Sequence, residues 1–213
     1  MRMTPKKLKE RKERILKLNR ALKKLFPKAE IELHFGSPLE LLIAVQLSAQ
    51  CTDKMVNKIT QMLFKKYKKL DDYTEVKPRE FERDIRSSGF YRNKTKNILA
   101  SARIIKEDCR GQIPKTMEEL LRLPGVGRKT ANVVLIEAYG VVVGIPVDTH
   151  VIRFVQRFDL SDYKDPVKIE KDLMKLLPKR EWKKFTHRVI QYGRHMRRQK
   201  NQNLIYYGDG IRF

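Results

Sequence analysis

Lys129 and Asp148 could act together as a nucleophile and its proton acceptor. Each is expected at the start of a helix, Lys129 just after the glycine hairpin "PGVG" and Asp148 as the N-cap of residues 149–158. Backbone dipoles at a helix N-terminus favour the neutral, nucleophilic amine of a lysine, and a nearby carboxylate can accept its proton. Taken alone, Asp148 is explained better as a helix cap.

The hairpin "LPGVG" carries Gly125 and Gly127 on either side of Val126. Glycines permit positive φ and leave backbone N–H groups uncovered, and such groups beside a helix N-terminus bind phosphate. Val126 can turn into the core. Residues of about 116–139 therefore fit a helix–hairpin–helix motif, although the hairpin alone is explained equally well by an ordinary connection between helices.

Two other phosphate-binding loops are excluded by their spacing. A P-loop places its lysine directly after a glycine, whereas Arg128 separates Gly127 from Lys129. A dinucleotide-binding loop follows a strand and has a third glycine, whereas here a helix is expected before the hairpin and Thr130 occupies that position.

The chain is strongly basic, with 48 Lys and Arg against 25 Asp and Glu and a net charge of +23. Residues 1–28 carry +10 of this charge and residues 179–200 carry +8. This excess favours a nucleic-acid partner, and the alternative is two solvated helices of a lysine-rich proteome. No apolar run approaches the roughly 20 residues of a membrane span, and no secretory signal is visible. The two cysteines, Cys51 and Cys109, indicate a reduced, cytoplasmic protein.

Helical periodicity and capping residues recur along the whole chain and predict an all-α fold. Capping boxes are expected at Ser37 with Glu40 and at Thr116 with Glu119. The single strand-like run, residues 139–147, is short and has no similar run to pair with. Helices are expected over residues 5–26, 38–50, 52–67, 91–109, 116–123 and 128–139, and further helix boundaries are expected at Asp148, Asp165 and Pro178.

Four segments resemble endonuclease III, a family of DNA glycosylases in the helix–hairpin–helix–Gly/Pro/Asp superfamily. The segments are "ELLIAVQLSAQCTD", "GFYRNKTKNI", "LPGVGRKTANVVL" and "VDTHVIRF", in the family's order and within about residues 30–195. The resemblance implies two helical domains that flank a DNA-binding cleft. Residues 32–142 would form a six-helix domain with the hairpin, and residues 1–31 would join 143–213 in a discontinuous, basic domain. Both basic blocks would then lie in that second domain, which favours a DNA-binding face.

The resemblance also implies base excision repair of double-stranded DNA by a bifunctional glycosylase and abasic-site lyase. A damaged base, here an oxidised pyrimidine, would be rotated out of the stack. Lys129 would attack the sugar carbon C1′ while Asp148 accepts the lysine proton or stabilises the positive sugar. The resulting Schiff base would lead to β-elimination and strand cleavage. The enzyme would work as a nucleoid-associated cytoplasmic protein with no membrane contact and no obligate protein partner.

Further DNA contacts follow from the same resemblance. Gln50 would fill the space of the flipped base and Phe90 would insert as a wedge, although without the family Gln50 is explained as a polar helix-end residue and Phe90 equally well as a core aromatic. His150 and, less strongly, Ser48 match family positions near the pocket. The hairpin residues expected to hold phosphate are Gly125, Val126, Gly127 and Arg128.

The family's 4Fe–4S cluster is expected to be absent. Arg197 stands at the position of the first cluster cysteine, and no cysteine follows it. We expect Arg194, Arg197, Arg198 and Lys200 to replace the DNA contact of the cluster loop. The structural role of the cluster would pass to packing by Leu204, Ile205, Tyr206, Tyr207 and Phe213.

Three other functions remain as alternatives. A mismatch glycosylase would remove uracil or thymine opposite guanine, but relatives of that kind often lack a lysine at the nucleophile position. A protein that only binds DNA would need neither Lys129 nor Asp148. A metal-dependent nuclease would need a ligand cluster that the sequence does not show.

Overall fold

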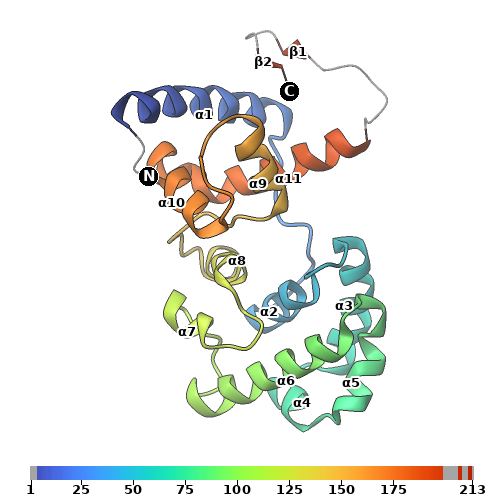
Figure 1. Ribbon diagram of the computed structural model, residues 1–213. Helices are drawn as coiled ribbons and strands as arrows, with labels where there is room; N and C mark the ends of the chain where they lie inside the picture. The colour runs from blue at the N-terminus through green and yellow to red at the C-terminus, as the bar shows by residue number, and fades with distance from the viewer. Residues whose placement is uncertain (1–3, 199–205, 208–210, 213) are drawn as a thin grey trace. The chain divides into compact units, whose positions relative to one another are not determined.

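The computed structural model describes residues 4–198, 206–207 and 211–212, with side chains for residues 4–197 (Figure 1). The described chain is helical, apart from one antiparallel pair of two-residue strands, β1 (Tyr206–Tyr207) and β2 (Ile211–Arg212). The prediction of an all-α fold is confirmed. Residues 140–147 form no strand, and no helix in the described part of the chain is long and apolar enough to cross a membrane.

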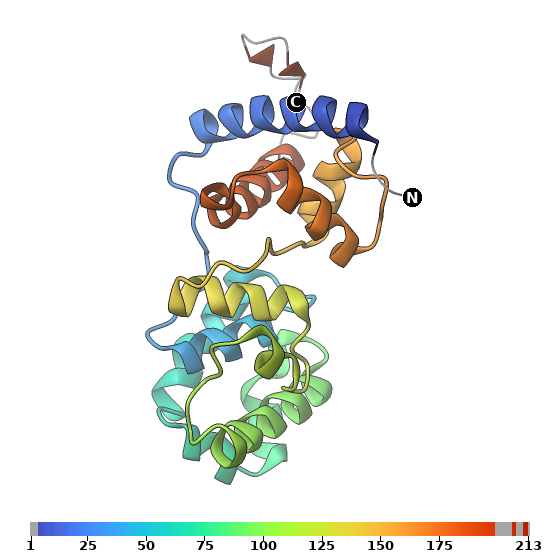
Figure 2. The same ribbon diagram turned by 90° about the vertical axis from the view of Figure 1, so that its left-hand side faces the viewer.

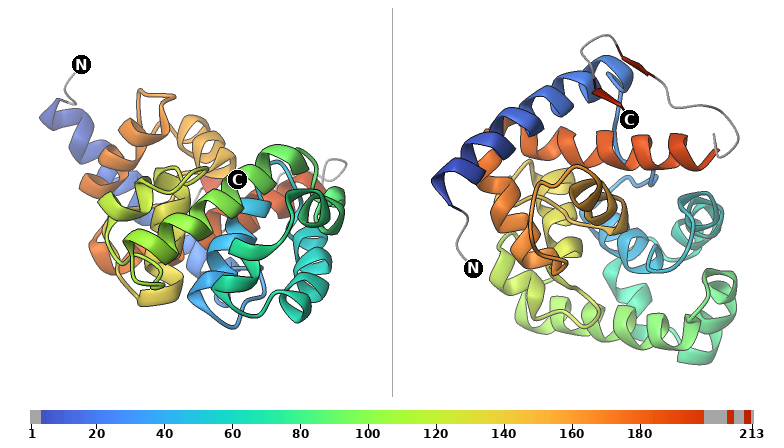
Figure 3. Two further views of the ribbon diagram at one scale, coloured as in Figure 1. Left: turned by 90° about the horizontal axis from the view of Figure 1, so that it is seen from below. Right: turned by 45° about the horizontal axis from the view of Figure 1, so that its top comes forward.

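The chain divides into two compact units, Glu32–Val143 and Met1–Ile31 with Gly144–Phe213. The first unit, which is described in full, holds seven α-helices rather than the expected six, because residues 70–84 form two short helices. Its helix α6 lies along these short helices, α4 and α5 (Figure 3). The helices are α2 (Pro38–Leu47), α3 (Asp53–Lys66), α4 (Leu70–Glu75), α5 (Pro78–Asp84), α6 (Tyr91–Asp108), α7 (Met117–Leu121) and α8 (Arg128–Tyr139), with a 3-10 turn, η1, at Arg86–Ser88.

The second unit joins the N-terminal helix to the C-terminal part of the chain. Helix α1 buries Ile15, Leu18 and Leu22 and packs on α10 and α11 (Figure 2). Helix α9 also packs on α10 and α11, so the four helices share one core. Their bounds are α1 (Pro5–Leu25), α9 (Thr149–Arg157), α10 (Pro166–Leu176) and α11 (Trp182–Arg198), with a 3-10 turn, η2, at Lys179–Glu181.

The helices begin at the expected capping residues, but the capping boxes are incomplete. The hydroxyls of Ser37 and Thr116 accept the N–H groups of Glu40 and Glu119 at 3.2 and 3.3 Å. The return bonds differ from the expected pattern. The Glu40 carboxylate accepts the N–H of Gly36 rather than that of Ser37, and Glu119 accepts the Thr116 hydroxyl at 2.7 Å. Spacing in the sequence therefore located the cap but not the partner of the glutamate.

The hairpin is supported by a core that α2, α6, α7 and α8 share. Val126 is buried in this core beside Leu120 and Leu123, as expected from the sequence. Ala131, Val134 and Leu135 contribute the inner face of α8. The start of α8, where Lys129 lies, is thus fixed by apolar packing on the opposite face of the helix.

A buried cation anchors α1 within its own unit. Arg11 is fully buried, and its Nη2 lies 2.6 Å from Asp159 Oδ1 and 2.8 Å from Asp162 Oδ1. Hydrogen bonds from Arg11 and from Lys7 lower the pKa of Asp162 to about 2. The two aspartates are half exposed, so water screens part of this attraction.

Arg11→Met should lower the free energy of unfolding by about 2 kcal/mol, less than for a fully buried pair because the aspartates remain hydrated. A carboxylate whose pKa is lower in the folded state stabilises the fold at pH values above its unfolded pKa, near 3.8 for aspartate. This contribution is lost as the pH falls towards 2. Between pH 4 and pH 2, the melting temperature should therefore fall less steeply for the variant than for the wild type. Parallel curves would contradict the role of Arg11.

Candidate active site

Lys129 is the second residue of α8 and is half-buried, in the unit of residues 32–143. Asp148 is the N-cap of α9, in the other unit. Both residues therefore lie at helix starts, as the sequence predicted. Their pairing across the two units stays a prediction.

The turn before α8 follows from its sequence. Val126 N–H donates to the carbonyl of Leu123 at 3.0 Å, which closes a four-residue turn with Pro124 second and Gly125 third. Gly125 has a φ of 76°, as the third residue of a type II turn requires. Because the turn uses the N–H of Val126, this group is not a free phosphate donor as the sequence interpretation assumed.

Gly127 differs from Gly125 in conformation and surroundings. Its φ is −90°, which any residue can adopt, so the expectation of positive φ holds for Gly125 alone. A Cβ at Gly127 would meet nothing within 4 Å, whereas one at Gly125 would lie 2.8 Å from Asn97 Nδ2. Gly127 is also the N-cap of α8 and gives that helix no capping side chain. In the described residues no acceptor is found for the Gly127 N–H. The start of α8 thus offers an uncovered donor where an anion is favoured.

Alanine substitutions should separate the roles of the two glycines. Gly125→Ala should cost about 1–3 kcal/mol of stability, because of its positive φ and the overlap with Asn97. Gly127→Ala should change stability by less than about 1 kcal/mol, yet weaken duplex DNA binding several-fold, because the methyl group would cover the N–H donor. Thermal melts and binding titrations at fixed salt test both. If both variants lose DNA binding equally and neither loses stability, the two glycines do not have the separate roles proposed here.

Three residues predicted to contact DNA line one hollow of about 220 Å³ in the unit of residues 32–143. They are Gln50, Phe90 and Gly125, and each lies at a helix end or a turn. Gln46 and Lys94 also line this hollow and were not singled out from the sequence. Gln46 is buried, and its Nε2 donates to the Pro124 carbonyl at 2.8 Å, which ties α2 to the hairpin. A polar residue within the apolar run "LLIAVQL" was the signal in the sequence.

Phe90 is 63% exposed, which excludes the interpretation of this side chain as a core aromatic. Its φ of 48° is uncommon for a residue other than glycine, and it immediately precedes α6. Gln50 is also exposed, with a φ of 52°. Ser48, the C-cap of α2, donates its hydroxyl to the Val45 carbonyl at 2.8 Å, so that donor is used within the helix end.

Asp148 caps α9 with a single oxygen. Its Oδ1 accepts the N–H groups of His150 and Val151 at 2.8 and 2.9 Å. Oδ2 has no hydrogen-bond partner in the described part of the chain. The capping role proposed from the sequence is thus real, and it leaves one carboxylate oxygen available for a second role.

His150 packs closely on α11. A Cβ at Gly193 would overlap the His150 ring, which explains a glycine inside a helix. Burial lowers the pKa of His150, the charge of Asp148 opposes this shift, and Arg197, Arg194 and Arg153 lower the pKa further. His150 and Arg197 also line one hollow of about 270 Å³ with Arg153 and Arg157.

The C-terminal replacement for a cluster can be followed only as far as residue 197. Arg194 is half-buried and Arg197 is exposed on α11. No side chain beyond residue 197 is described, so the predicted DNA contacts of Arg198 and Lys200 lie outside the described side chains. The same holds for the packing proposed for Leu204, Ile205, Tyr206, Tyr207 and Phe213, although the backbone of Tyr206 and Tyr207 is described as β1.

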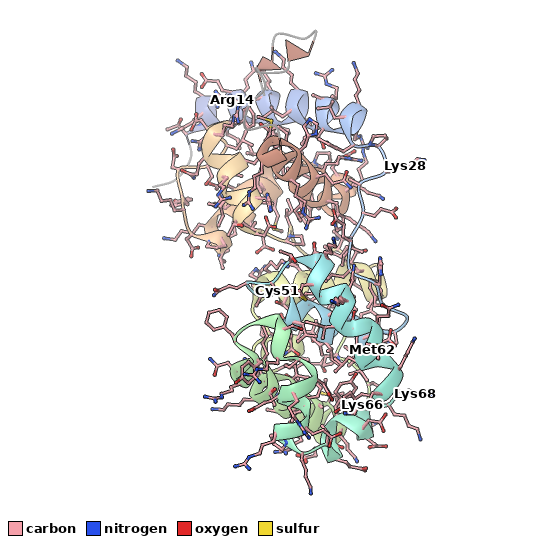
Figure 4. All side chains as sticks on the ribbon, turned by 90° about the vertical axis from the view of Figure 1, so that its right-hand side faces the viewer. Arg14, Lys28, Cys51, Met62, Lys66 and Lys68 are labelled. Atoms are coloured by element: carbon pink, nitrogen blue, oxygen red, sulfur yellow. The ribbon has the colours of Figure 1, made fainter. Side chains whose placement is uncertain are left out.

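The cysteines do not fit a 4Fe–4S cluster. Such a cluster is held by four thiolates, and the chain has only Cys51 and Cys109. Cys51 lies just before α3 and Cys109 directly follows α6, both in the unit of residues 32–143 (Figure 4). Within the described ranges, no three His, Cys, Asp or Glu side chains are grouped to hold a metal ion.

Comparison with known proteins identifies the family. The model of HhH-GPD superfamily base excision DNA repair proteins matches residues 43–179. Endonuclease III of Synechocystis is 47% identical over 88% of this chain and 86% of its own length. Two solved endonuclease III structures, a non-covalent DNA complex and a trapped covalent intermediate with DNA, each match with a TM-score of 0.84, 48% identity and 86% coverage of both chains. The chain belongs to the endonuclease III family.

The superfamily match spans five of the residues predicted for the site. Gln50, Phe90, Lys129, Asp148 and His150 all fall inside residues 43–179. The C-terminal arginines lie beyond this range. The part of the chain that departs from the cluster-bearing pattern of endonuclease III is therefore separate in sequence from the residues proposed for catalysis.

Proposed function

We propose that this member of the endonuclease III family removes oxidised pyrimidines from double-stranded DNA, with Lys129 as nucleophile and Asp148 as its partner. The protein is a base-excision DNA glycosylase and abasic-site lyase, as its family membership indicates. One observation carries the assignment of Asp148: Oδ1 alone caps α9, which leaves Oδ2 to take a proton or face a positive charge.

The reaction begins with the damaged nucleotide rotated out of the stack. The bond between C1′ and the base breaks, the base leaves with the electron pair, and Lys129 Nζ bonds to C1′. Asp148 accepts the lysine proton or stabilises the positive sugar. The C1′–O4′ bond then breaks as O4′ takes a proton, which leaves a Schiff base between Nζ and C1′. Loss of a proton from C2′ of this Schiff base breaks the C3′–O3′ bond and expels the 3′ phosphate by β-elimination.

Duplex DNA is held through contacts that read no bases. The uncovered N–H of Gly127 and the start of α8 bind a backbone phosphate beside Arg128. Gln50 enters the space that the flipped base vacates, and exposed Phe90 inserts between bases. His150 lies next to the flipped nucleotide, with Ser48 near the Gln50 turn. Arg194, Arg197 and Arg198 add positive charge at the end of α11.

The enzyme works without an iron–sulfur cluster in this proposal. Two cysteines cannot supply four thiolates, so the arginines of α11 take the place of the cluster loop in DNA binding. Action on DNA would place the protein with the nucleoid in the cytoplasm, and one lesion requires only a monomer.

A panel of duplexes tests the substrate range. Oligonucleotides with thymine glycol, uracil opposite guanine and thymine opposite guanine are incubated with the protein in EDTA. We expect base release and strand cleavage on thymine glycol, at a rate at least about ten times that on the mismatches. Activity on the mismatches alone would favour the mismatch glycosylase, and binding with no product would favour a non-catalytic protein. Loss of cleavage in EDTA would favour a metal-dependent nuclease.

Phe90→Ala tests the proposed wedge. Because the side chain is largely exposed, we expect the free energy of unfolding to change by less than about 0.5 kcal/mol. Base removal from duplex DNA should fall about 10- to 50-fold, since the cost of unstacking is no longer offset. Met62→Ala is the matched control, because Met62 is 68% exposed on α3 of the same unit (Figure 4). Equal rates for the two variants would exclude the wedge.

A further inference from the structure

Lys94 is a buried cation at the hollow that contains Gln50 and Phe90. It is the fourth residue of α6, and only 6% of it is exposed. Its Nζ donates to the carbonyls of Leu47 and Ser88, each at 2.8 Å. In the described residues no carboxylate pairs with it, so both recorded partners are backbone groups.

These two carbonyls belong to the segments that carry Gln50 and Phe90, the two side chains proposed to enter the duplex. Leu47 is the last residue of α2, three positions before Gln50. Ser88 ends the turn η1, two positions before Phe90. A helix C-terminus leaves its last carbonyls unpaired and carries partial negative charge, which favours a cation at Leu47. One ammonium group therefore links the two segments.

The cost of burying Lys94 indicates a geometric role. Removal of an ammonium group from water is unfavourable, and burial lowers the pKa of Lys94 accordingly. An apolar side chain of similar length would fill the same space without this cost. Gln50 and Phe90 both adopt positive φ, a conformation that persists in residues other than glycine only where the surroundings fix it. The two hydrogen bonds of Lys94 fix the backbone just before each of them.

We propose that Lys94 is a positioning residue that holds the Gln50 turn and the Phe90 loop together so that both side chains enter the duplex as a unit. This inference rests on the proposed function, in which Gln50 replaces the flipped base and Phe90 inserts beside it. Lys94 acts through these two residues and does not touch the reacting atoms. Its loss should therefore affect substrates that require a base to be displaced from a duplex.

Lys94→Met, which keeps the length of the side chain and removes the donor, tests the proposal. Under single-turnover conditions on a duplex with thymine glycol, we expect base removal to fall about 10- to 100-fold. Borohydride trapping on a single-stranded abasic oligonucleotide, where no paired base is displaced, should stay within about 3-fold of the wild type. Lys106→Met is the matched control, since it removes the same charge from an exposed position of α6 that pairs with Asp71.

The Lys94 substitution is repeated in a protein that lacks both side chains, to show whether Lys94 acts through Gln50 and Phe90. In a Gln50→Ala/Phe90→Ala protein, Lys94→Met should change the duplex rate by less than about 2-fold, because the residues that it positions are absent. If Lys94→Met still lowers the rate of base removal from the duplex by about 10-fold or more in this double-alanine protein, the proposal is overturned. An equal loss on single-stranded and duplex substrates would also overturn it and would indicate a general structural role.

Two further outcomes are distinguishable. If Lys94→Met does not fold by circular dichroism, the comparison is made with Lys94→Arg, and a duplex-specific loss that disappears in the double-alanine background supports the proposal. The same loss in both backgrounds contradicts it. If the wild type forms no adduct on either abasic substrate, the proposed lyase function itself fails, and the inference fails with it.

Discussion

Asp148→Asn is expected to leave the fold intact and to lower the rate of base removal by about 10²- to 10⁴-fold. Asparagine caps a helix about as well as aspartate, so its side-chain oxygen can still accept the N–H groups of His150 and Val151. The amide cannot accept a proton or carry the negative charge, and proton transfer by a positioned group contributes a factor of this size. Thermal melts and single-turnover rates on a thymine glycol duplex measure the two effects separately.

Asp165→Asn is the control for this substitution. Asp165 caps α10 in the same unit, and its Oδ1 accepts the N–H of Lys168 at 2.9 Å. We expect wild-type rates for it. Asp148→Ala should lose the same activity as Asp148→Asn and also about 1 kcal/mol of stability. If Asp148→Asn keeps full activity, Asp148 is only a helix cap.

Lys129→Ala is expected to abolish the lyase reaction, with strand cleavage at abasic sites reduced by at least about 10³-fold. The variant removes the amine that we propose forms the covalent bond, and we expect no other side chain to take its place. Alanine is favourable within a helix, so α8 should persist. Gel assays of abasic-site cleavage measure the loss, and binding of a duplex with a stable abasic analogue should stay within about 10-fold.

Lys106→Ala is the charge-matched control for Lys129→Ala, because Lys106 is exposed and pairs only with Asp71 among the described residues. Its cleavage rate should equal that of the wild type. If Lys129→Ala weakens DNA binding and cleavage by the same factor, Lys129 is a phosphate ligand rather than the nucleophile.

The sequence predicted most of the local features that position this site. Local signals determine helix ends, and Ser37, Thr116 and Asp148 cap their helices as expected. The turn "LPGV" likewise encodes its own geometry through Pro124 and Gly125. These features depend on neighbours within a few residues, which is why spacing alone located them.

The features that the sequence did not reveal depend on contacts between distant segments. Nothing near Lys94 shows that its amine meets carbonyls at positions 47 and 88, because only the packing of α6 on α2 and η1 brings them together. Gly193 similarly has no local cause, since the His150 ring belongs to another helix. Asp148 shows the same division. The sequence indicated that it caps α9, but only the structure shows that the cap uses Oδ1 alone and leaves Oδ2 open among the described residues.

Lys129 is proposed to form the covalent bond to the sugar, and peptide mapping of the borohydride-trapped adduct can identify the amine that reacts. Wild-type protein is reacted with a duplex containing an abasic site, reduced, digested with nuclease and protease, and analysed by mass spectrometry. We expect a deoxyribose-derived mass increase on Lys129 and on no other lysine of this strongly basic chain. An adduct on a different amine, or no adduct at all, would contradict it.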